Sequence, residues 1–339
     1  MWYRCHIGIH TDAADDRAEK GSAMQSVLAL DIGGTKLATG VVTSDGSVHG
    51  FTAVPTRRDE GPDVIIPRLF ELGRQSMRAA EQAGVSAPEG VGISCGGPLD
   101  AAAGVLVNPL HLPGWIDVPI VELAQREFEL PAALENDATL AALAEHRHGA
   151  AVGERSMIYL TISTGIGGGA VLDDRLYRGA AGNGGEFGHI TVVRGGRPCL
   201  CGRNGCLEAY ASGTFIGVRA DEAIASGRAT SLTSPATAEQ VARAAASGDA
   251  LASEIWDETV ELLGQAITDF VNIIEPDVVV LGGGVTRSGA QLLDPIRRIV
   301  LAGAMRPAAA AVRVELAALG DTVCVVGAGD LALDLLAVH

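Results

Sequence analysis

The sequence predicts a duplicated α/β fold, in which two similar lobes face each other across a cleft. The main observation is a repeated unit of strand, glycine turn and returning strand, DIGGTKLATGVV at 31–42 and STGIGGGAVL at 163–172. Short apolar runs alternate with segments of helical spacing in both halves of the chain, as in α/β domains. The 339 residues are enough for two domains of ordinary size.

In the first half, apolar runs bounded by glycine or by Asp45-Gly46 predict strands, and apolar residues at helical spacing predict helices. Asp137 stands where the second of these helices is expected to begin. The expected elements are strands at 27–31, 37–42 and 47–54, a helix at 62–83, strands at 91–97 and 132–135, and a helix at 137–148.

The second half repeats this plan after residue 156. Asp173-Asp174 is expected to turn the chain, and three glycines at 282–284 follow a buried apolar run. The expected elements are strands at 157–164 and 170–172, helices at 236–247 and 250–274, a strand at 278–281, a helix at 288–299, a strand at 312–317, and a strand, turn and helix at 323–336.

Charge and hydropathy exclude several classes of protein. The net charge of −16 disfavours nucleic acid and anionic membranes as partners, because both require a basic surface. No apolar run is long enough to span a bilayer, and residues 1–24 lack the apolar core of a signal peptide. We expect these first residues to be a disordered extension and the chain to be cytoplasmic, where thiols stay reduced.

The segment 186–208, EFGHITVVRGGRPCLCGRNGCLE, gathers one histidine and three cysteines between two carboxylates, Glu186 and Glu208. Three thiolates and one imidazole form the ligand set of a structural zinc site. A lone Cys-x-Cys would indicate no more than small buried side chains, but the full spacing favours a metal. A disulfide is the weaker alternative in a reducing compartment. The expected ligands are His189, Cys199, Cys201 and Cys206.

The two glycine turns are candidate phosphate-binding hairpins. Glycine lets backbone N–H groups approach an anion closely, and a carboxylate at the end of the preceding strand can hold Mg²⁺ through water. Taken singly, each turn could equally be an ordinary hairpin, but one in each lobe could clamp a polyphosphate from both sides. The candidate residues are Asp31, Gly33, Gly34, Thr35, Lys36, Thr164, Gly165 and, for the base or ribose, Gly282, Gly283 and Gly284.

Two other nucleotide motifs are excluded. No GxxxxGK[ST] run occurs in the chain, which rules out a Walker A loop. Gly327, Gly329 and Ala332 partly match a dinucleotide fingerprint, but the βαβ unit that this motif requires cannot fit before the chain ends at His339.

The pair Asn136-Asp137 is the candidate catalytic centre. A carboxylate at a helix start between two lobes can accept a proton from a substrate hydroxyl, and the neighbouring amide can orient other hydroxyls. The alternative is that Asp137 only caps its helix, which is the more common role of an aspartate in this position.

These motifs together resemble the ROK family (repressor, open reading frame, kinase) of the hexokinase–actin–Hsp70 superfamily. The resemblance extends over nearly everything after Met24. It rests on DIGGTK, STGIGGG and LGGGV, which look like the two phosphate motifs and the adenosine motif, and on GNGGEFGH and CLCGRNGCLE, which match the sugar and zinc motifs. Within the family, the match is best to bacterial kinases of glucose.

The resemblance implies a two-lobed hexokinase/actin-like (ribonuclease H-like) fold and ATP-dependent phosphorylation of the 6-hydroxyl of glucose, with Mg²⁺ and a structural zinc. Asp137 would be the base, and His189 would bind zinc with one ring nitrogen and face the sugar with the other. The implied sugar-binding residues are Gly97, Asn136, Asp137, Glu186, His189 and Glu208. The turn SCGGPLD at 94–100 departs from the commonest pattern of the family at Cys95 and Gly96.

The expected domains are a small lobe of residues 25–137 and 325–339, and a larger lobe of residues 138–324 that carries the zinc loop. Three alternatives stay open: an N-acetylhexosamine kinase, a family repressor and a sugar-binding module without catalysis. Polyphosphate stays open as the phosphoryl donor, since it could lie in the same loops. Because only 30 residues precede Asp31, we expect no DNA-reading domain. The expected partners are a sugar and a nucleotide, and the expected assembly is a homodimer or homotetramer.

Overall fold

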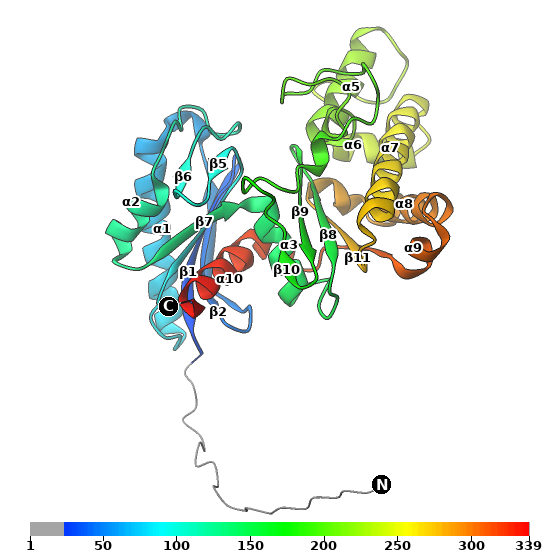
Figure 1. Ribbon diagram of the computed structural model, residues 1–339. Coiled ribbons are helices and arrows are strands. Elements are labelled where there is room, and N and C mark those ends of the chain that lie inside the picture. The colour runs from blue at the N-terminus through cyan, green and yellow to red at the C-terminus, as the bar shows by residue number, and fades with distance from the viewer. Residues whose placement is uncertain (1–23, 339) are drawn as a thin grey trace, which may run out of the picture.

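The computed structural model describes residues 24–338, which form two lobes that each contain a five-stranded sheet (Figure 1). The expected disordered extension at 1–24 lies outside the described residues except for Met24. Helices α3 (Asp137–His148) and α10 (Val323–Ala337) lie between the two sheets (Figure 1).

The first sheet has the order β3-β2-β1-β4-β7. Strands β1, β2 and β3 are antiparallel, and β4 and β7 continue the sheet in parallel with β1. Every residue of β1 is buried, as expected from its apolar run. The bounds are β1 Ser26–Ile32, β2 Lys36–Thr43, β3 Val48–Pro55, β4 Val91–Cys95 and β7 Ala132–Asn136.

The second sheet, in the order β10-β9-β8-β11-β12, repeats the first strand for strand. Its first three strands are antiparallel, and the last two run parallel to β8. The predicted duplication is therefore confirmed, including the direction of each strand. The bounds are β8 Met157–Ile162, β9 Ile166–Leu172, β10 Arg175–Leu176, β11 Val278–Gly282 and β12 Arg313–Leu316.

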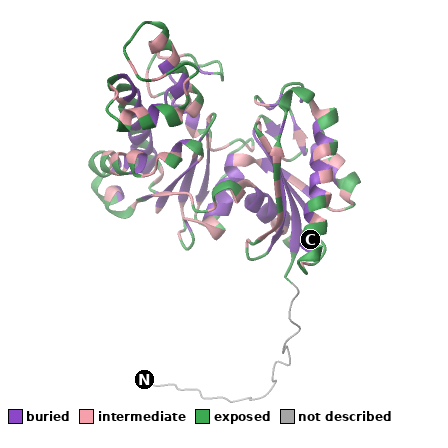
Figure 2. Cartoon of the chain, turned by 180° about the vertical axis from the view of Figure 1, so that it is seen from behind, coloured by how far each residue is buried: buried purple, intermediate pink, exposed green. Residues whose placement is uncertain are grey.

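Helices cover the faces of both sheets. Buried positions lie on the strands and on the inner faces of the helices, whereas the outer faces are exposed (Figure 2). The first lobe carries α1 Pro62–Gln82 and α2 Ile120–Phe128. The second lobe carries α4 Glu208–Ala211, α5 Gly213–Ala225, α6 Ala238–Ala246, α7 Ala250–Ile274, α8 Ala290–Gly303 and α9 Arg306–Ala311.

The predicted strand and turn at 323–329 are wrong, because this segment belongs to the single helix α10. Its residues from Val325 to Ala332 are all buried, and a helix that is apolar on every side shows no periodicity that would distinguish it from a strand. The glycines serve close packing: a Cβ at Gly327 would lie 2.2 Å from the carbonyl oxygen of Leu140 in α3, and one at Gly329 would lie 2.5 Å from Val42 in β2.

Several short elements were not predicted, among them α2, α5 and the two-stranded ribbon of β5 (Leu99–Asp100) and β6 (Val105–Leu106). Four 3-10 turns also occur in the described part of the chain: η1 Arg58–Glu60, η2 Phe187–His189, η3 Gly284–Ser288 and η4 Gly320–Thr322. Across residues 24–338, no helix combines the length and the apolar character that crossing a bilayer requires.

Candidate functional site

The candidate catalytic residues lie at the carboxyl ends of the three parallel strands of the first sheet. Ile32 of β1 pairs with Cys95 of β4, and Cys95 pairs with Asn136 of β7, so the three strands end at the same level. The first phosphate hairpin, the Gly96-Gly97 turn and Asp137 therefore follow from neighbouring strand ends. This edge is where open α/β sheets bind their ligands.

Asp31 is buried at the end of β1 and accepts a hydrogen bond from Ser94 Oγ over 2.8 Å. Burial raises the pKa of Asp31 to about 7, and the nearby Asp137 charge raises it further, whereas Ser94 and Lys36 lower it. A buried carboxylate that resists ionisation next to a second carboxylate fits a site that becomes charged when a cation is present. This is the arrangement expected of a Mg²⁺ ligand.

The two members of the Asn136-Asp137 pair have different backbone roles. Asn136 is the N-cap of α3, and its Oδ1 accepts hydrogen bonds from the backbone N–H groups of Ala138 and Thr139. Asp137 Oδ1 accepts a hydrogen bond from Ala138 N over 2.7 Å. Because Asn136 satisfies the helix start, Asp137 is not needed as the N-cap.

Burial also raises the pKa of Asp137, an effect that the His111 imidazole opposes. Sequence reasoning missed His111, which lies in the segment between β6 and α2. A carboxyl group with a raised pKa in a cleft has the character of a general base, since it binds a proton more readily than an exposed aspartate.

The first hairpin carries Gly33, Gly34 and Thr35 at its tip between β1 and β2. The backbone N–H of Gly33 donates to Lys36 O over 3.0 Å, and a Cβ at Gly33 would lie 2.8 Å from that same oxygen. The turn therefore requires glycine at this position. Lys36 is directed away from the hairpin, with its Nζ 3.2 Å from the carbonyl oxygen of Asp321 near the start of α10.

The second hairpin, with Thr164 and Gly165 at its tip, lies beside the start of α3. A Cβ at Gly167 would lie 3.0 Å from the Cβ of Ala138, the residue after Asp137. The expected turn was too long, because Ile166 to Gly169 already belong to strand β9. Glycine is needed there for the close approach of β9 to α3.

The Gly282-Gly283-Gly284 turn lies against the second hairpin. A Cβ at Gly282 would come within 2.2 Å of Tyr159 Oη, and one at Gly283 would lie 2.5 Å from the carbonyl oxygen of Ile162. Gly283 also has a φ of 89°, which favours glycine. The structure therefore brings this candidate adenosine motif together with the second candidate phosphate hairpin.

All four predicted zinc ligands come together. The candidate ligand atoms of His189, Cys199, Cys201 and Cys206 all lie within 4.8 Å of one another. Cys201 Sγ lies 3.7 Å from Cys206 Sγ, and Cys199 Sγ lies 3.6 Å from His189 Nδ1. A tetrahedral zinc with bonds of about 2.3 Å to sulfur and about 2.1 Å to nitrogen gives separations of about 3.7 and 3.6 Å. The residues therefore fit zinc.

The zinc cluster orients the predicted sugar-binding groups around it. His189 directs Nδ1 to the thiols, and its Nε2 lies 3.8 Å from Glu186 Oε2. Glu208 Oε1 lies 3.8 Å from Cys199 Sγ, and its Oε2 accepts a hydrogen bond from Ile166 N over 2.8 Å. Glu208 therefore connects the zinc loop to the second hairpin.

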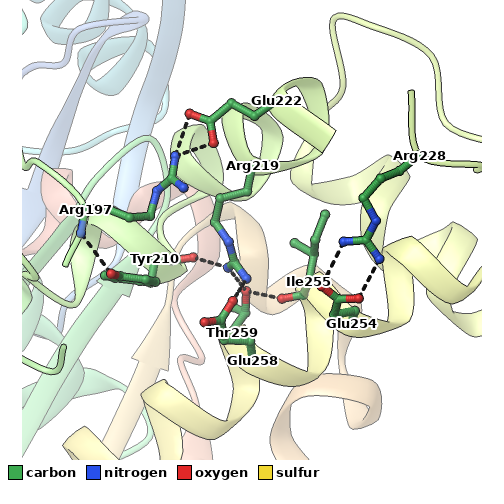
Figure 3. Close-up of polar contacts among 9 residues, drawn as sticks. All are labelled: Arg197, Tyr210, Arg219, Glu222, Arg228, Glu254, Ile255, Glu258 and Thr259. Atoms are coloured by element: carbon green, nitrogen blue, oxygen red, sulfur yellow. Dashed lines mark hydrogen bonds and ion pairs between the residues drawn. The ribbon is translucent and has the colours of Figure 1, made fainter. Parts of the chain in front are cut away.

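A network of arginines connects the predicted zinc loop and α4 to helices α5 and α7 (Figure 3). Arg197 binds both carboxylate oxygens of Glu222 at 2.6 and 2.7 Å, and its backbone N–H donates to Tyr210 Oη over 2.9 Å. Arg219, which is 7% exposed, donates to the carbonyl oxygen of Tyr210 over 2.8 Å and also contacts Glu258. Because Tyr210 lies in the same short helix as Glu208, this network supports the predicted sugar-binding carboxylate.

An ion pair that the sequence did not reveal joins the two lobes next to the candidate catalytic pair. The buried carboxylate of Glu135 accepts from Arg178 Nε over 2.7 Å and from Asn136 N over 3.0 Å. Arg178 precedes the GNGGEFGH segment and belongs to the second lobe, so this ion pair aligns the strand end of β7 with the predicted sugar motif. Glu135 and Arg178 are 43 positions apart in the sequence, so no local pattern predicts that they pair.

Comparison with known proteins identifies the family to which the chain belongs. Residues 27–335 match the ROK family. The chain is 32% identical to the glucokinase of Halalkalibacterium halodurans over 311 residues, 90% of this chain and 94% of that protein. It is 34% identical to an N-acetylmannosamine kinase of Yersinia pestis over 260 residues, 76% of this chain and 82% of that protein.

A solved structure shows the same architecture over most of the chain. It is a ROK family glucokinase of Streptomyces griseus in complex with glucose and AMPPNP, 32% identical, with a TM-score of 0.76 over 91% of this chain and 99% of that one. The hexokinase/actin-like fold implied by the sequence motifs is thus confirmed.

Proposed function

Because this chain belongs to the ROK family, we propose that it is an ATP-dependent hexose kinase that phosphorylates the 6-hydroxyl of glucose. The observation that carries this proposal is the position of Asp137. Asp137 lies at the carboxyl ends of the parallel strands. The next residue, Ala138, packs on Gly167 of the second hairpin.

In the proposed reaction, Asp137 takes the proton of the sugar 6-hydroxyl. The bond between that oxygen and the γ-phosphorus forms as the bond from the γ-phosphorus to its bridging oxygen breaks, which yields the sugar 6-phosphate and ADP. Phosphoryl transfer depends mainly on positioning and charge neutralisation. Asp137 supplies the base, and the rest of the site holds the two substrates in line.

The nucleotide would lie against the two glycine hairpins and the Gly282-Gly283-Gly284 turn. Backbone N–H groups of Gly34 and Gly165 would bind the phosphates, and Gly33 would keep the turn in shape through its own N–H bond to Lys36 O. When bound, Mg²⁺ would neutralise charge on the β- and γ-phosphates. Asp31 is the candidate to hold it, because burial raises the pKa of this carboxyl to about 7 and a bound cation would favour its charged form.

The sugar hydroxyls would be bound by Asn136, Glu186, His189 and Glu208, with the backbone of Gly97 beside them. A Cβ at Gly97 would lie at an ordinary contact distance of 3.8 Å from Asn136 Nδ2, so the turn passes beside that amide. The four zinc ligands would keep the loop in shape, and the metal would fix the tautomer of His189 without taking part in the transfer.

The test is a coupled ADP-release assay with glucose, mannose, N-acetylmannosamine and N-acetylglucosamine. We expect the highest kcat/KM with glucose. A preference for an N-acetylhexosamine would favour the second candidate, which the kinase relative from Yersinia supports. Sugar binding without ADP release on any sugar would point to a regulator and contradict the proposal.

We also propose that the lobes are residues 25–137 with 325–339, and residues 138–324, and that they close on the substrates to exclude water. A cytoplasmic location is proposed because the thiolate ligands need a reducing compartment. A homodimer or homotetramer is proposed because closed symmetry is the rule among soluble oligomers. Light scattering coupled to size-exclusion chromatography measures the assembly directly.

A further inference from the structure

His111 lies at the point where the two substrates of the proposed reaction would meet, although none of the motifs named in the sequence analysis includes it. A Cβ at Gly34, in the first phosphate hairpin, would lie 3.0 Å from the Cβ and Cδ2 atoms of His111. A Cβ at Gly96, in the turn next to the sugar site, would lie 2.3 Å from His111 Cε1. One imidazole ring therefore contacts both turns, and both turns need glycine to admit it.

Asp137 and His111 act on each other. Burial of the ring lowers the pKa of His111 below its ordinary value; the Asp137 charge and the Ile32 backbone oppose this effect, and the Arg58 charge adds to it. The imidazole in turn lowers the pKa of Asp137. His111 is half-buried. The imidazole is thus placed against the first hairpin and the Gly96-Gly97 turn, close enough to Asp137 for each charge to act on the other.

We propose that His111 is a further catalytic residue of this kinase, whose imidazole contacts the phosphoryl group during its transfer to the sugar. The proposal rests on the proposed function. The phosphoryl group in transfer must lie between the first hairpin and the sugar hydroxyl that Asp137 would deprotonate. His111 contacts this hairpin at Gly34, and its charge acts on Asp137. An imidazole N–H there would donate a hydrogen bond to the equatorial phosphoryl oxygens, where charge collects in the transition state.

The test compares His111→Ala, His111→Asn and the control His49→Ala, a histidine on β3, in the full chain with glucose and ATP. Both His111 variants should lose about 10- to 1,000-fold in kcat, the range for one electrostatic contact in a transition state. The KM values for glucose and ATP should stay within about threefold. Added imidazole should restore part of the kcat of His111→Ala, because the vacated space is bounded by Gly34 and Gly96, but should not accelerate the wild type.

Gly96→Ala supplies a second test that leaves the imidazole in the chain. The added methyl group overlaps the ring position, so this variant should also lose kcat, and imidazole should not restore it. A kcat of His111→Ala within about twofold of the wild type would overturn the proposal, as would a loss that imidazole does not reverse. These results leave the kinase assignment intact if the wild type phosphorylates glucose, whereas a wild type inactive on every hexose overturns both.

Discussion

Glu208 Oε2 accepts a hydrogen bond from the backbone N–H of Ile166 over 2.8 Å, although the two residues are 42 positions apart. Glu208 is the proposed sugar ligand at the end of the zinc loop, and Ile166 is the first residue of β9, directly after the second phosphate hairpin. The close fit at Gly165, where a Cβ would lie 2.6 Å from Glu208 Oε2, fixes the same contact. The proposed sugar and nucleotide sites therefore share a carboxylate.

Glu208→Gln should raise the KM for both substrates. The neutral amide accepts weaker hydrogen bonds from the sugar and from Ile166 N, and bonds to charged groups contribute about 1.5–3 kcal/mol. We expect the KM for glucose to rise about 10- to 100-fold and the KM for ATP to rise by a smaller factor. Steady-state kinetics measures both, with Glu239→Gln on the exposed face of α6 as the control. An unchanged KM for ATP would show that the two sites are not coupled.

Removal of one zinc ligand should abolish metal binding and weaken sugar binding together. In Cys201→Ala, the remaining three ligands cannot close a tetrahedral site, and structural zinc contributes about 10–16 kcal/mol of apparent binding energy in small zinc peptides. We expect less than one zinc per chain by elemental analysis and a KM for glucose at least about tenfold higher. A zinc-free protein with full glucose affinity would contradict the proposed role of the metal.

Arg219→Met should destabilise the protein and disturb the sugar site without removing zinc. The substitution leaves the carbonyl oxygen of Tyr210 and the hydroxyl of Thr259 without their buried donor. Each unsatisfied buried group costs about 1–3 kcal/mol, so the free energy of unfolding should fall by that amount or more. Urea denaturation measures it, and Arg243→Met, an exposed arginine on α6, is the control. Equal stability of the two variants would show that the network in Figure 3 is not structural support.

The strands, the glycine turns and the zinc ligands could be predicted from the sequence because each depends on residues close together in the chain. Ser94 binds Asp31 across 63 positions, and Arg178 binds Glu135 across 43, so no local pattern reveals either contact. His111 was missed for the same reason. The first part of helix α10 was predicted as a strand and a turn, because uniform burial removes the helical period from its sequence.

Asp31→Asn should stabilise the protein without ligands while removing its response to Mg²⁺. Because folding raises the pKa of Asp31 from 3.8 to about 7, the folded state favours the protonated acid. This favourable contribution is complete below about pH 4 and is lost as pH rises towards about 7. The Tm of Asp31→Asn should therefore exceed that of the wild type at pH 8 and approach it at pH 4.

The comparison of Tm values needs a measurement with and without Mg²⁺ and nucleotide at pH 8. Adding Mg²⁺ and nucleotide should raise the Tm of the wild type by more than the Tm of Asp31→Asn. The reason is that the bound cation supplies a counter-charge to Asp31 in the wild type only. If the two proteins showed the same pH dependence of Tm, Asp31 would not be the buried titrating group.

The most direct test of the central claim, that Asp137 is the base facing a sugar held by the zinc loop, is the turnover of Asp137→Ala with glucose and ATP. General base catalysis contributes about 10²–10⁴-fold, so kcat should fall by at least that factor while zinc content, Tm and glucose affinity stay close to those of the wild type. A kcat near the wild-type value would remove Asp137 from the reaction and contradict the account.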